Sequence, residues 1–351
     1  MKKYFSIELL RFLTSLSVLL YHYRHFFSPY NILSRENYEI FSSNLPFYSI
    51  INSFYSHGFY GVHVFYTISG FVFAYVYLSL KRETSIKEFS INRIARLYPL
   101  HFLTLIIVAI LQLSYLLKFG NFQFDLINDF YHFLLQLFFI SSWGFESGNS
   151  FNGPIWSVSV EIGIYIIFFF LIKFINKYNI YLLILLSLIL IIIDKLNYID
   201  TLFLECARLF FSGVLIYYLY EKFIKNKSIF FLFGLTLMIL SFIGNFKTFV
   251  FCPAILMVFL SLENFIKNEN LKSIFNSLGN LTYSLYLLHI PFQLMIIYTT
   301  YLLFEDLDII YNNYFFTIYF VTLFVIAHFT FNLYEKPLNR FIRKKFSPKK
   351  T

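Results

Sequence analysis

Charged residues are scarce in this sequence. Only 13% of its 351 residues are Asp, Glu, Lys or Arg, whereas soluble domains carry about 25%. Hydrophobic residues make up 58% of the chain. They gather in repeated apolar runs of about 20 residues, the length at which a helix crosses a bilayer. The composition therefore excludes an ordinary soluble protein and predicts an all-α, polytopic membrane protein.

Cysteine is scarce as well. The chain has only Cys206 and Cys252, and each stands alone among apolar neighbours. This spacing excludes a disulfide framework and a cysteine-based metal site. No other metal motif occurs, so we expect no metal ligand and no bound cofactor.

The start of the chain lacks a cleavage signal. No small-residue cleavage site follows Met1-Lys2-Lys3, so the first apolar run predicts an uncleaved span rather than a removed signal peptide. The net charge of +9 does not indicate nucleic acid, because the basic residues lie in short segments between apolar runs. We therefore expect membrane lipids, and no nucleic acid, among the partners.

About ten transmembrane helices are predicted from the apolar runs. They are expected at about 5–25, 57–80, 98–117, 154–174, 179–195, 201–221, 229–246, 248–265, 280–303 and 312–334. Segment 130–143 is apolar but short, which leaves open a re-entrant or an interfacial position.

The basic residues set the orientation of these spans. With ten spans, most of the 28 Lys and Arg residues share one side of the membrane, including those of 81–96 and 336–350. A full span at 130–143 would invert every later loop. The positive-inside rule therefore favours ten spans with both termini cytoplasmic.

The first span carries polar residues on one face. Arg11 and His22 are eleven positions apart, so they fall within roughly 20° of each other around a helix. Glu8 lies one turn from Arg11. Ionisable residues inside a span are usually functional or paired. The alternative is a Glu8–Arg11 pair near one surface, with His22 reaching water at the other.

The second span has small residues near the expected midplane. Ser69 and Gly70 lie there, which is compatible with close approach of a ligand or with helix–helix packing. His63 is expected near the outer surface, exposed to water.

Two arginines precede the third span. Arg93 and Arg96 are three residues apart, so on a helix they point the same way. Their forked donors suit phosphate groups. The alternative is an orientation signal that contacts anionic lipid headgroups.

A carboxylate lies inside the fourth span. Glu161 is expected at about 10 Å from the outer end, a depth similar to that of His22. A carboxylate beside an imidazole can orient it as a general base. We therefore expect Glu161 to meet His22, with Ser157 one turn away. A pair of Glu161 with Arg208 is the alternative.

The segment 280–292 presents a second polar face. Tyr283, Tyr286 and His289 recur every three residues, and Pro291 opens a backbone hydrogen bond nearby. The alternative is a kinked packing helix with a satisfied histidine.

Taken together, six segments resemble the acyltransferase 3 family of bacterial membrane proteins. They occur in family order and cover nearly the whole chain. They are Arg11 with His22, GVHVFYTISGF at 61–71, NRIARLYP at 92–99, WSVSVEIGIY at 156–165, TYSLYLLHIPF at 282–292 and YEKP at 334–337. One departure is Tyr66, where many relatives have Phe.

The resemblance implies a stand-alone membrane domain over 1–340, followed by a basic cytoplasmic tail at 341–351, in the cytoplasmic (inner) membrane. It implies an O-acyltransferase, commonly an O-acetyltransferase, that takes the acyl group from cytosolic acyl-coenzyme A. The implied acceptor is a hydroxyl of a carbohydrate, such as a cell-surface polysaccharide or its lipid-linked precursor.

The resemblance also implies roles for single residues. His22 matches the essential histidine and Glu161 the acidic residue of the fourth span. Arg11, Arg93 and Arg96 match arginines associated with the donor. We expect the pocket or the oxyanion stabiliser among Ser69, Trp156, Ser157, Tyr286 and His289.

A transporter or flippase of glycans or lipids is the rival interpretation. Buried polar residues could line a path without any acyl transfer. Broken-helix signals are modest, however, and no inverted repeat stands out. Thiol release from acetyl-coenzyme A would separate the two classes.

Overall fold

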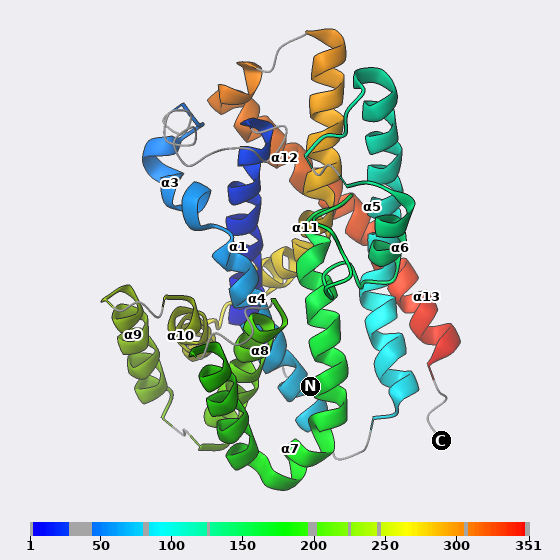
Figure 1. The fold of residues 1–351 in the computed structure, drawn as a ribbon. Coiled ribbons are helices and arrows are strands. Elements are labelled where there is room, and N and C mark those ends of the chain that lie inside the picture. The colour runs from blue at the N-terminus through cyan, green and yellow to red at the C-terminus, as the bar shows by residue number, and fades with distance from the viewer. Residues whose placement is uncertain are drawn as a thin grey trace. The chain divides into compact units, whose positions relative to one another are not determined.

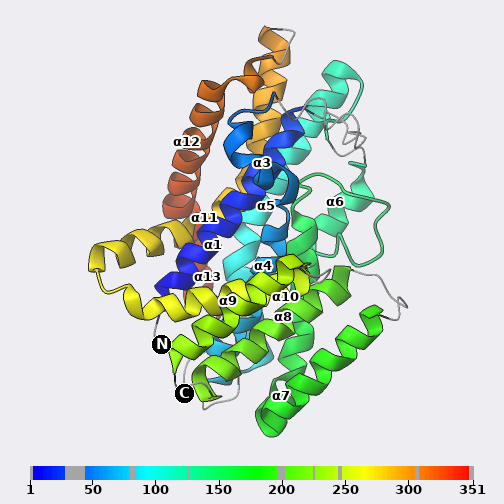
Figure 2. The same cartoon turned by 90° about the vertical axis from the view of Figure 1, so that its left-hand side faces the viewer.

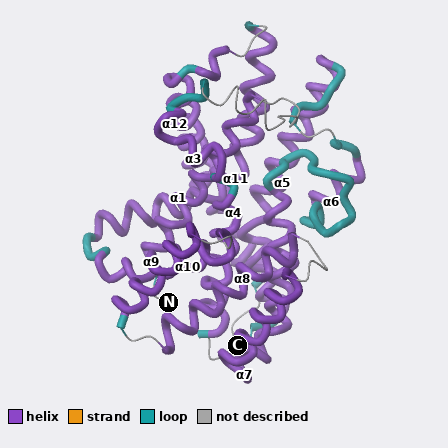
Figure 3. Tube along the Cα trace, turned by 60° about the vertical axis from the view of Figure 1, so that its left-hand side comes forward, coloured by secondary structure: helices purple, strands orange, loops and turns teal. Residues whose placement is uncertain are grey.

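The described structure is helical throughout, as the sequence predicts. This computed structural model describes residues 3–27, 44–79, 84–124, 127–195, 202–223, 226–243, 247–304 and 308–347. Its described part contains no strand (Figure 3). Seven of the described helices are long and apolar enough to cross a membrane. The all-α, multi-pass prediction is confirmed, while the count of ten spans stays a prediction.

The chain divides into two compact units. Unit 1 contains residues 1–15, 60–86 and 160–280, and unit 2 contains residues 16–59, 87–159 and 281–351. Three helices are divided between the units, namely α1 (Phe5–His22), α7 (Ile155–Lys195) and α11 (Glu269–Leu303), and α5 (Ile86–Phe119) has only its first residue in unit 1.

Unit 1 is built around two pairs of helices. Helix α4 (Tyr60–Phe73) packs along α8 (Leu202–Tyr218), and α9 (Lys227–Ile243) lies beside α10 (Lys247–Leu262), as Figures 1 and 2 show. Short π-helical turns, Ala74–Leu78 and Leu219–Phe223, extend α4 and α8.

Glycines set the close contact of α4 with α8. A Cβ atom at Gly70 would overlap the carbonyl of Phe210, and one at Gly213 would overlap the carbonyl of Thr67. Small residues allow membrane helices to approach closely in this way. The packing interpretation of Gly70 is therefore the one that the structure supports.

Unit 2 contains most of the other helices. They are the 3-10 turn Tyr23–Phe27, α3 (Tyr48–His57), most of α5 (Ile86–Phe119), α6 (Phe130–Leu137), most of α11, α12 (Asn313–Thr330), the π-helical turn Phe331–Glu335 and α13 (Lys336–Phe346).

Several helices extend beyond the apolar runs that predict them. Helix α5 begins at Ile86, so Arg93 and Arg96 lie on a helix and not in a loop. Helix α11 begins at Glu269, well before the expected start at 280. Hydrophobicity marks where a helix enters the bilayer, whereas the backbone hydrogen bonds continue through the polar turns outside it.

Helix α7 joins two predicted spans. It runs without interruption from Ile155 to Lys195, through the expected spans 154–174 and 179–195, and Figure 1 shows a sharp bend along it. No Gly or Pro separates the two apolar runs, so no residue between them stops the helix.

Segment 130–143 does not form a spanning helix. Helix α6 has 8 residues, about 12 Å of rise, whereas the apolar core of a bilayer is about 30 Å thick. A loop follows α6 and leads to α7. The span count that follows from the basic residues is therefore not altered by this segment.

Candidate functional site

The last residue of α1 is hydrogen-bonded to a second histidine. His22 Nδ1 lies 2.7 Å from His289 Nε2 on α11, and the planes of the two rings differ by only 18°. The side-chain amide of Gln293 donates to the backbone carbonyl of His22 over 2.9 Å. All three residues belong to unit 2, and His289 and Gln293 are fully buried.

The hydrogen bonds of His289 assign the tautomers. His289 Nδ1 faces the carbonyl of Leu285 at 3.3 Å, and a carbonyl can only accept, so Nδ1 carries the hydrogen. In the neutral ring, Nε2 then accepts a hydrogen from His22 Nδ1. The remaining nitrogen of His22, Nε2, keeps its lone pair and is the atom able to take a proton from a substrate.

A third histidine adjoins this pair. The ring of His25 lies 4.8 Å from that of His22, centroid to centroid, at an interplanar angle of 21°. The ring of His25 also lies 5.2 Å from that of Phe124, centroid to centroid. Across the described residues, no group of three metal-ligating side chains has the geometry to hold a metal ion.

Asn152 fixes the part of α11 that carries His289. Pro291 lacks a backbone N–H, so the carbonyl of Leu287 loses its helical donor. The amide of Asn152 donates one hydrogen to that carbonyl over 3.1 Å and another to Thr104 Oγ1 over 3.2 Å. This buried amide thus replaces the backbone bond that the proline removes.

Three oxygens meet at the start of α7. Ser157 Oγ lies 2.7 Å from the Tyr286 hydroxyl, and both groups lie within hydrogen-bonding distance of the carbonyl of Pro154, at 3.1 and 3.0 Å. The hydroxyl groups of Ser157 and Tyr286 have one hydrogen each, so these two hydrogens are shared among the three close oxygen–oxygen contacts. Trp156, the residue before Ser157, is half-buried. Its backbone N–H donates a hydrogen bond to the carbonyl of Gly153.

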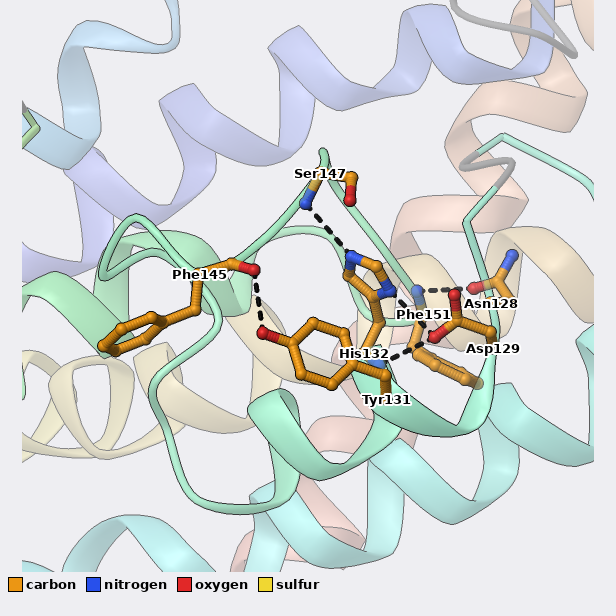
Figure 4. Close-up of polar contacts among 7 residues, drawn as sticks. All are labelled: Asn128, Asp129, Tyr131, His132, Phe145, Ser147 and Phe151. Carbon is orange, nitrogen blue, oxygen red and sulfur yellow. Dashed lines mark hydrogen bonds and ion pairs between the residues drawn. The ribbon is translucent and has the colours of Figure 1, made fainter.

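The loop that carries Asn152 is fastened to α6. Asp129 caps α6 by accepting from the backbone N–H of His132 over 2.8 Å, and it accepts from His132 Nδ1 over 2.8 Å (Figure 4). These bonds hold the pKa of the Asp129 carboxyl below its ordinary value of 3.8. The backbone N–H of Ser147 donates to His132 Nε2 over 3.1 Å.

This Asp–His–Ser arrangement is a fastening and not a nucleophilic triad. The serine reaches the imidazole through its backbone N–H, so both ring nitrogens of His132 are already engaged. Further bonds close the same loop (Figure 4): Tyr131 donates to the carbonyl of Phe145 over 3.0 Å, and the N–H of Phe151 donates to Asn128 over 2.6 Å.

The predicted donor residue Arg96 has a buried anionic partner in unit 2. Its guanidinium nitrogen NH1 lies 3.7 Å from Oε1 of Glu335, which is 2% exposed. Arg93 lies one turn earlier on α5 and is half-buried. Glu335 belongs to the YEKP segment at 334–337, whose sequence alone predicts no role for this carboxylate.

The other predicted site residues lie in unit 1. Arg11 pairs with Glu8 over 3.1 Å, as the alternative for the first span expects. The hydroxyl of Ser69 accepts from that of Tyr165 over 3.4 Å. Glu161 is half-buried on α7. Because Glu161 belongs to unit 1 and His22 to unit 2, their meeting stays a prediction.

Unit 1 also contains a histidine–carboxylate contact that sequence reasoning missed. His63 is 6% exposed and not solvated, and its Nε2 lies 2.9 Å from Oε1 of Glu205. The expectation of a water-exposed His63 is therefore wrong. A buried imidazole at this position is stabilised because a carboxylate from α8 lies against it.

Comparison with known proteins adds a second line of evidence. A family model described as "Acyltransferase domain" matches residues 4–331. Acyltransferase MdmB of Streptomyces mycarofaciens is 33% identical over 112 residues, which is 30% of this chain and 26% of that protein. The chain thus matches about a quarter of the length of this relative. No solved structure matches.

Proposed function

This chain belongs to the acyltransferase family whose domain model spans residues 4–331, and from that premise we propose that it O-acylates a carbohydrate at the expense of an acyl-coenzyme A, with acetyl as the acyl group. It is a transferase of groups other than aminoacyl groups. The acceptor is a hydroxyl of a cell-surface polysaccharide or of its lipid-linked precursor.

The observation that carries the proposal is the His22–His289 hydrogen bond. It leaves His22 Nε2 as the basic nitrogen, and His289 can share the positive charge that develops when His22 takes a proton. In the proposed reaction, His22 removes the hydroxyl proton while the oxygen attacks the thioester carbon. The carbon–sulfur bond breaks, and the proton passes to the coenzyme A thiolate.

The donor is proposed to bind through its phosphates. Arg93 and Arg96 share one face of the first turns of α5, and guanidinium groups suit phosphate. Arg11 belongs to the same proposal through the family motif. No cofactor is proposed; acyl-coenzyme A is a substrate. The pocket or the oxyanion stabiliser is proposed among Ser69, Trp156, Ser157 and Tyr286. His289 is proposed for the pocket alone, because both of its ring nitrogens are engaged.

The proposed location is the cytoplasmic membrane, with both termini inside. The basic residues of α13 and of the segment before α5 support this orientation. In this orientation, a cytosolic donor reaches Arg93 and Arg96 from the inner side of the membrane. His22 is the last residue of α1 and then lies at the outer end of the first span.

A transport function without chemistry is the alternative to test. The purified full chain should release coenzyme A thiol from acetyl-coenzyme A when a glycan extract from the same cells is added. A transporter or flippase would release no thiol above background. His22→Gln serves as the matched control, because it keeps a hydrogen-bonding side chain but accepts no proton at neutral pH.

A further inference from the structure

A buried carboxylate lies at the end of the π-helical turn Phe331–Glu335. Glu335 is 2% exposed, and burying an ionised carboxylate is costly unless partners compensate its charge. Single π-helical turns inside helices are frequent at functional sites. The proposed catalytic residues do not include Glu335, so its burial needs a separate explanation.

Each carboxylate oxygen of Glu335 faces a different helix of unit 2. Oε1 lies 3.7 Å from NH1 of Arg96 on α5. Oε2 accepts a hydrogen bond of 2.7 Å from Ser284 Oγ on α11. The serine thereby fixes the orientation of the carboxylate, and the carboxylate holds one end of the Arg96 guanidinium.

The surrounding backbone is held at the same level. The neighbouring Tyr334 donates to the carbonyl of Pro99 over 3.2 Å, and Tyr283 donates to the carbonyl of Leu97 over 2.7 Å. Tyr334 and Tyr283, which precede Glu335 and Ser284 in the sequence, thus bind the turn of α5 that follows Arg96. The carboxylate of Glu335 therefore projects from a backbone whose position relative to α5 is fixed by hydrogen bonds.

We infer that Glu335 is a positioning residue of the donor site: it holds the Arg96 guanidinium, with Ser284 as its support, in the orientation that receives a phosphate of acyl-coenzyme A. The inference rests on the proposed function. A guanidinium has five N–H donors, so contact with Glu335 through NH1 leaves donors for a phosphate. The side chain of Arg96 is 27% exposed, which gives such a ligand access.

The inference separates the two arginines. Glu335 contacts Arg96 and acts on the donor through it, so the effect of removing the carboxylate should depend on Arg96. The same effect should be independent of Arg93, which binds in its own right. Neighbouring groups that act as a unit show this kind of non-additivity, whereas independent ones add.

Coenzyme A binding to the purified full chain provides the test. Glu335→Gln should weaken binding roughly five- to thirtyfold, and Ser284→Ala should weaken it less, in the same direction. In an Arg96→Ala background, Glu335→Gln should weaken coenzyme A binding almost no further. In an Arg93→Ala background it should keep its full effect. Glu269→Gln, an exposed carboxylate change on α11, controls for net charge.

Two outcomes would overturn the inference. Unchanged or tighter binding in Glu335→Gln means that the carboxylate only neutralises Arg96. If Glu335→Gln weakens coenzyme A binding equally with and without Arg96, the carboxylate stabilises the fold and does not act through Arg96. If Glu335→Gln does not reach the membrane, Ser284→Ala replaces it in the same combinations with Arg96→Ala and Arg93→Ala. The same two results would then overturn the inference. Wild-type protein that neither binds coenzyme A nor releases thiol contradicts the proposed function itself, a different result from normal wild-type binding with unaffected variants.

Discussion

At the scale of single residues, the hydrogen bond between His22 and His289 determines what the site can do. A lone imidazole has two tautomers, and only one presents Nε2 as a base. His289 selects that tautomer because its own Nδ1 is committed to the carbonyl of Leu285. A neutral imidazole thus takes the orienting position that a carboxylate holds in hydrolase triads.

His289→Phe should slow acyl transfer about 10- to 100-fold, because Phe keeps a ring of similar size but accepts no hydrogen bond from His22. His289→Gln should retain more activity, since its amide oxygen can accept that bond. Transfer rates at matched membrane abundance check this, with the exposed His328→Phe as control. A wild-type rate in His289→Phe would show that the pair is irrelevant to catalysis.

Glu161 gives the competing account of the same imidazole. If the carboxylate orients His22, Glu161→Gln should be the severe change and His289→Phe the mild one. The comparison of these two variants therefore assigns the orienting role.

Sequence reasoning could single out His22 and His289 as candidates but could not predict that they pair. An imidazole in an apolar span is conspicuous, because few ionisable residues are tolerated there. The partner of His22 lies 267 positions further along the chain, and such a distance is fixed only by tertiary packing. Asn152, Gln293 and Glu335 were missed for a similar reason: their contacts are made to carbonyls and side chains of other helices.

At the scale of elements, α11 depends on a residue outside it. Asn152→Ala leaves the carbonyl of Leu287 without the donor that replaces its lost backbone bond. We expect a cost of about 1–3 kcal/mol in the free energy of unfolding and a slower transfer, because the turn that carries His289 loosens. Denaturant unfolding in detergent measures the cost. Asn332→Ala, which removes exposed hydrogen bonds, should change little.

We expect the fastening of the loop to α6 to depend on pH. The lowered pKa of Asp129 means that its stabilising contribution is fully present above 3.8 and is lost as the pH falls through the pKa of the folded state. Asp129→Asn keeps a helix cap but loses the charge. It should melt at a lower temperature than the wild type at pH 7, and the difference should shrink at pH 3. A constant difference would contradict this role.

Element boundaries show the limit of hydropathy. The apolar runs predicted every long helix of the described residues, since burial in lipid needs such runs. They did not predict that α5 starts at Ile86 or that α7 is one helix, because the polar turns at the membrane surface are held by backbone hydrogen bonds that composition does not report.

At the scale of the whole molecule, orientation is the first property to test. Single cysteines at Lys344 and Asp308 should differ: an impermeant maleimide applied to intact cells should modify position 308 and spare position 344, because basic segments stay inside. The natural Cys206 and Cys252 are buried, which keeps the background low. The reverse labelling pattern would show that the topology is inverted. The proposed donor site would then face the outside of the cell, away from cytosolic acyl-coenzyme A.

The central claim is that His22 is the general base of an acyl transfer. It is tested most directly by following the acceptor-dependent release of thiol from acetyl-coenzyme A by purified wild-type protein and by His22→Gln at equal concentration. The account predicts turnover by the wild type and a loss of roughly 10²–10⁴-fold in the variant, with coenzyme A binding retained. Turnover in His22→Gln within a fewfold of wild type would contradict it.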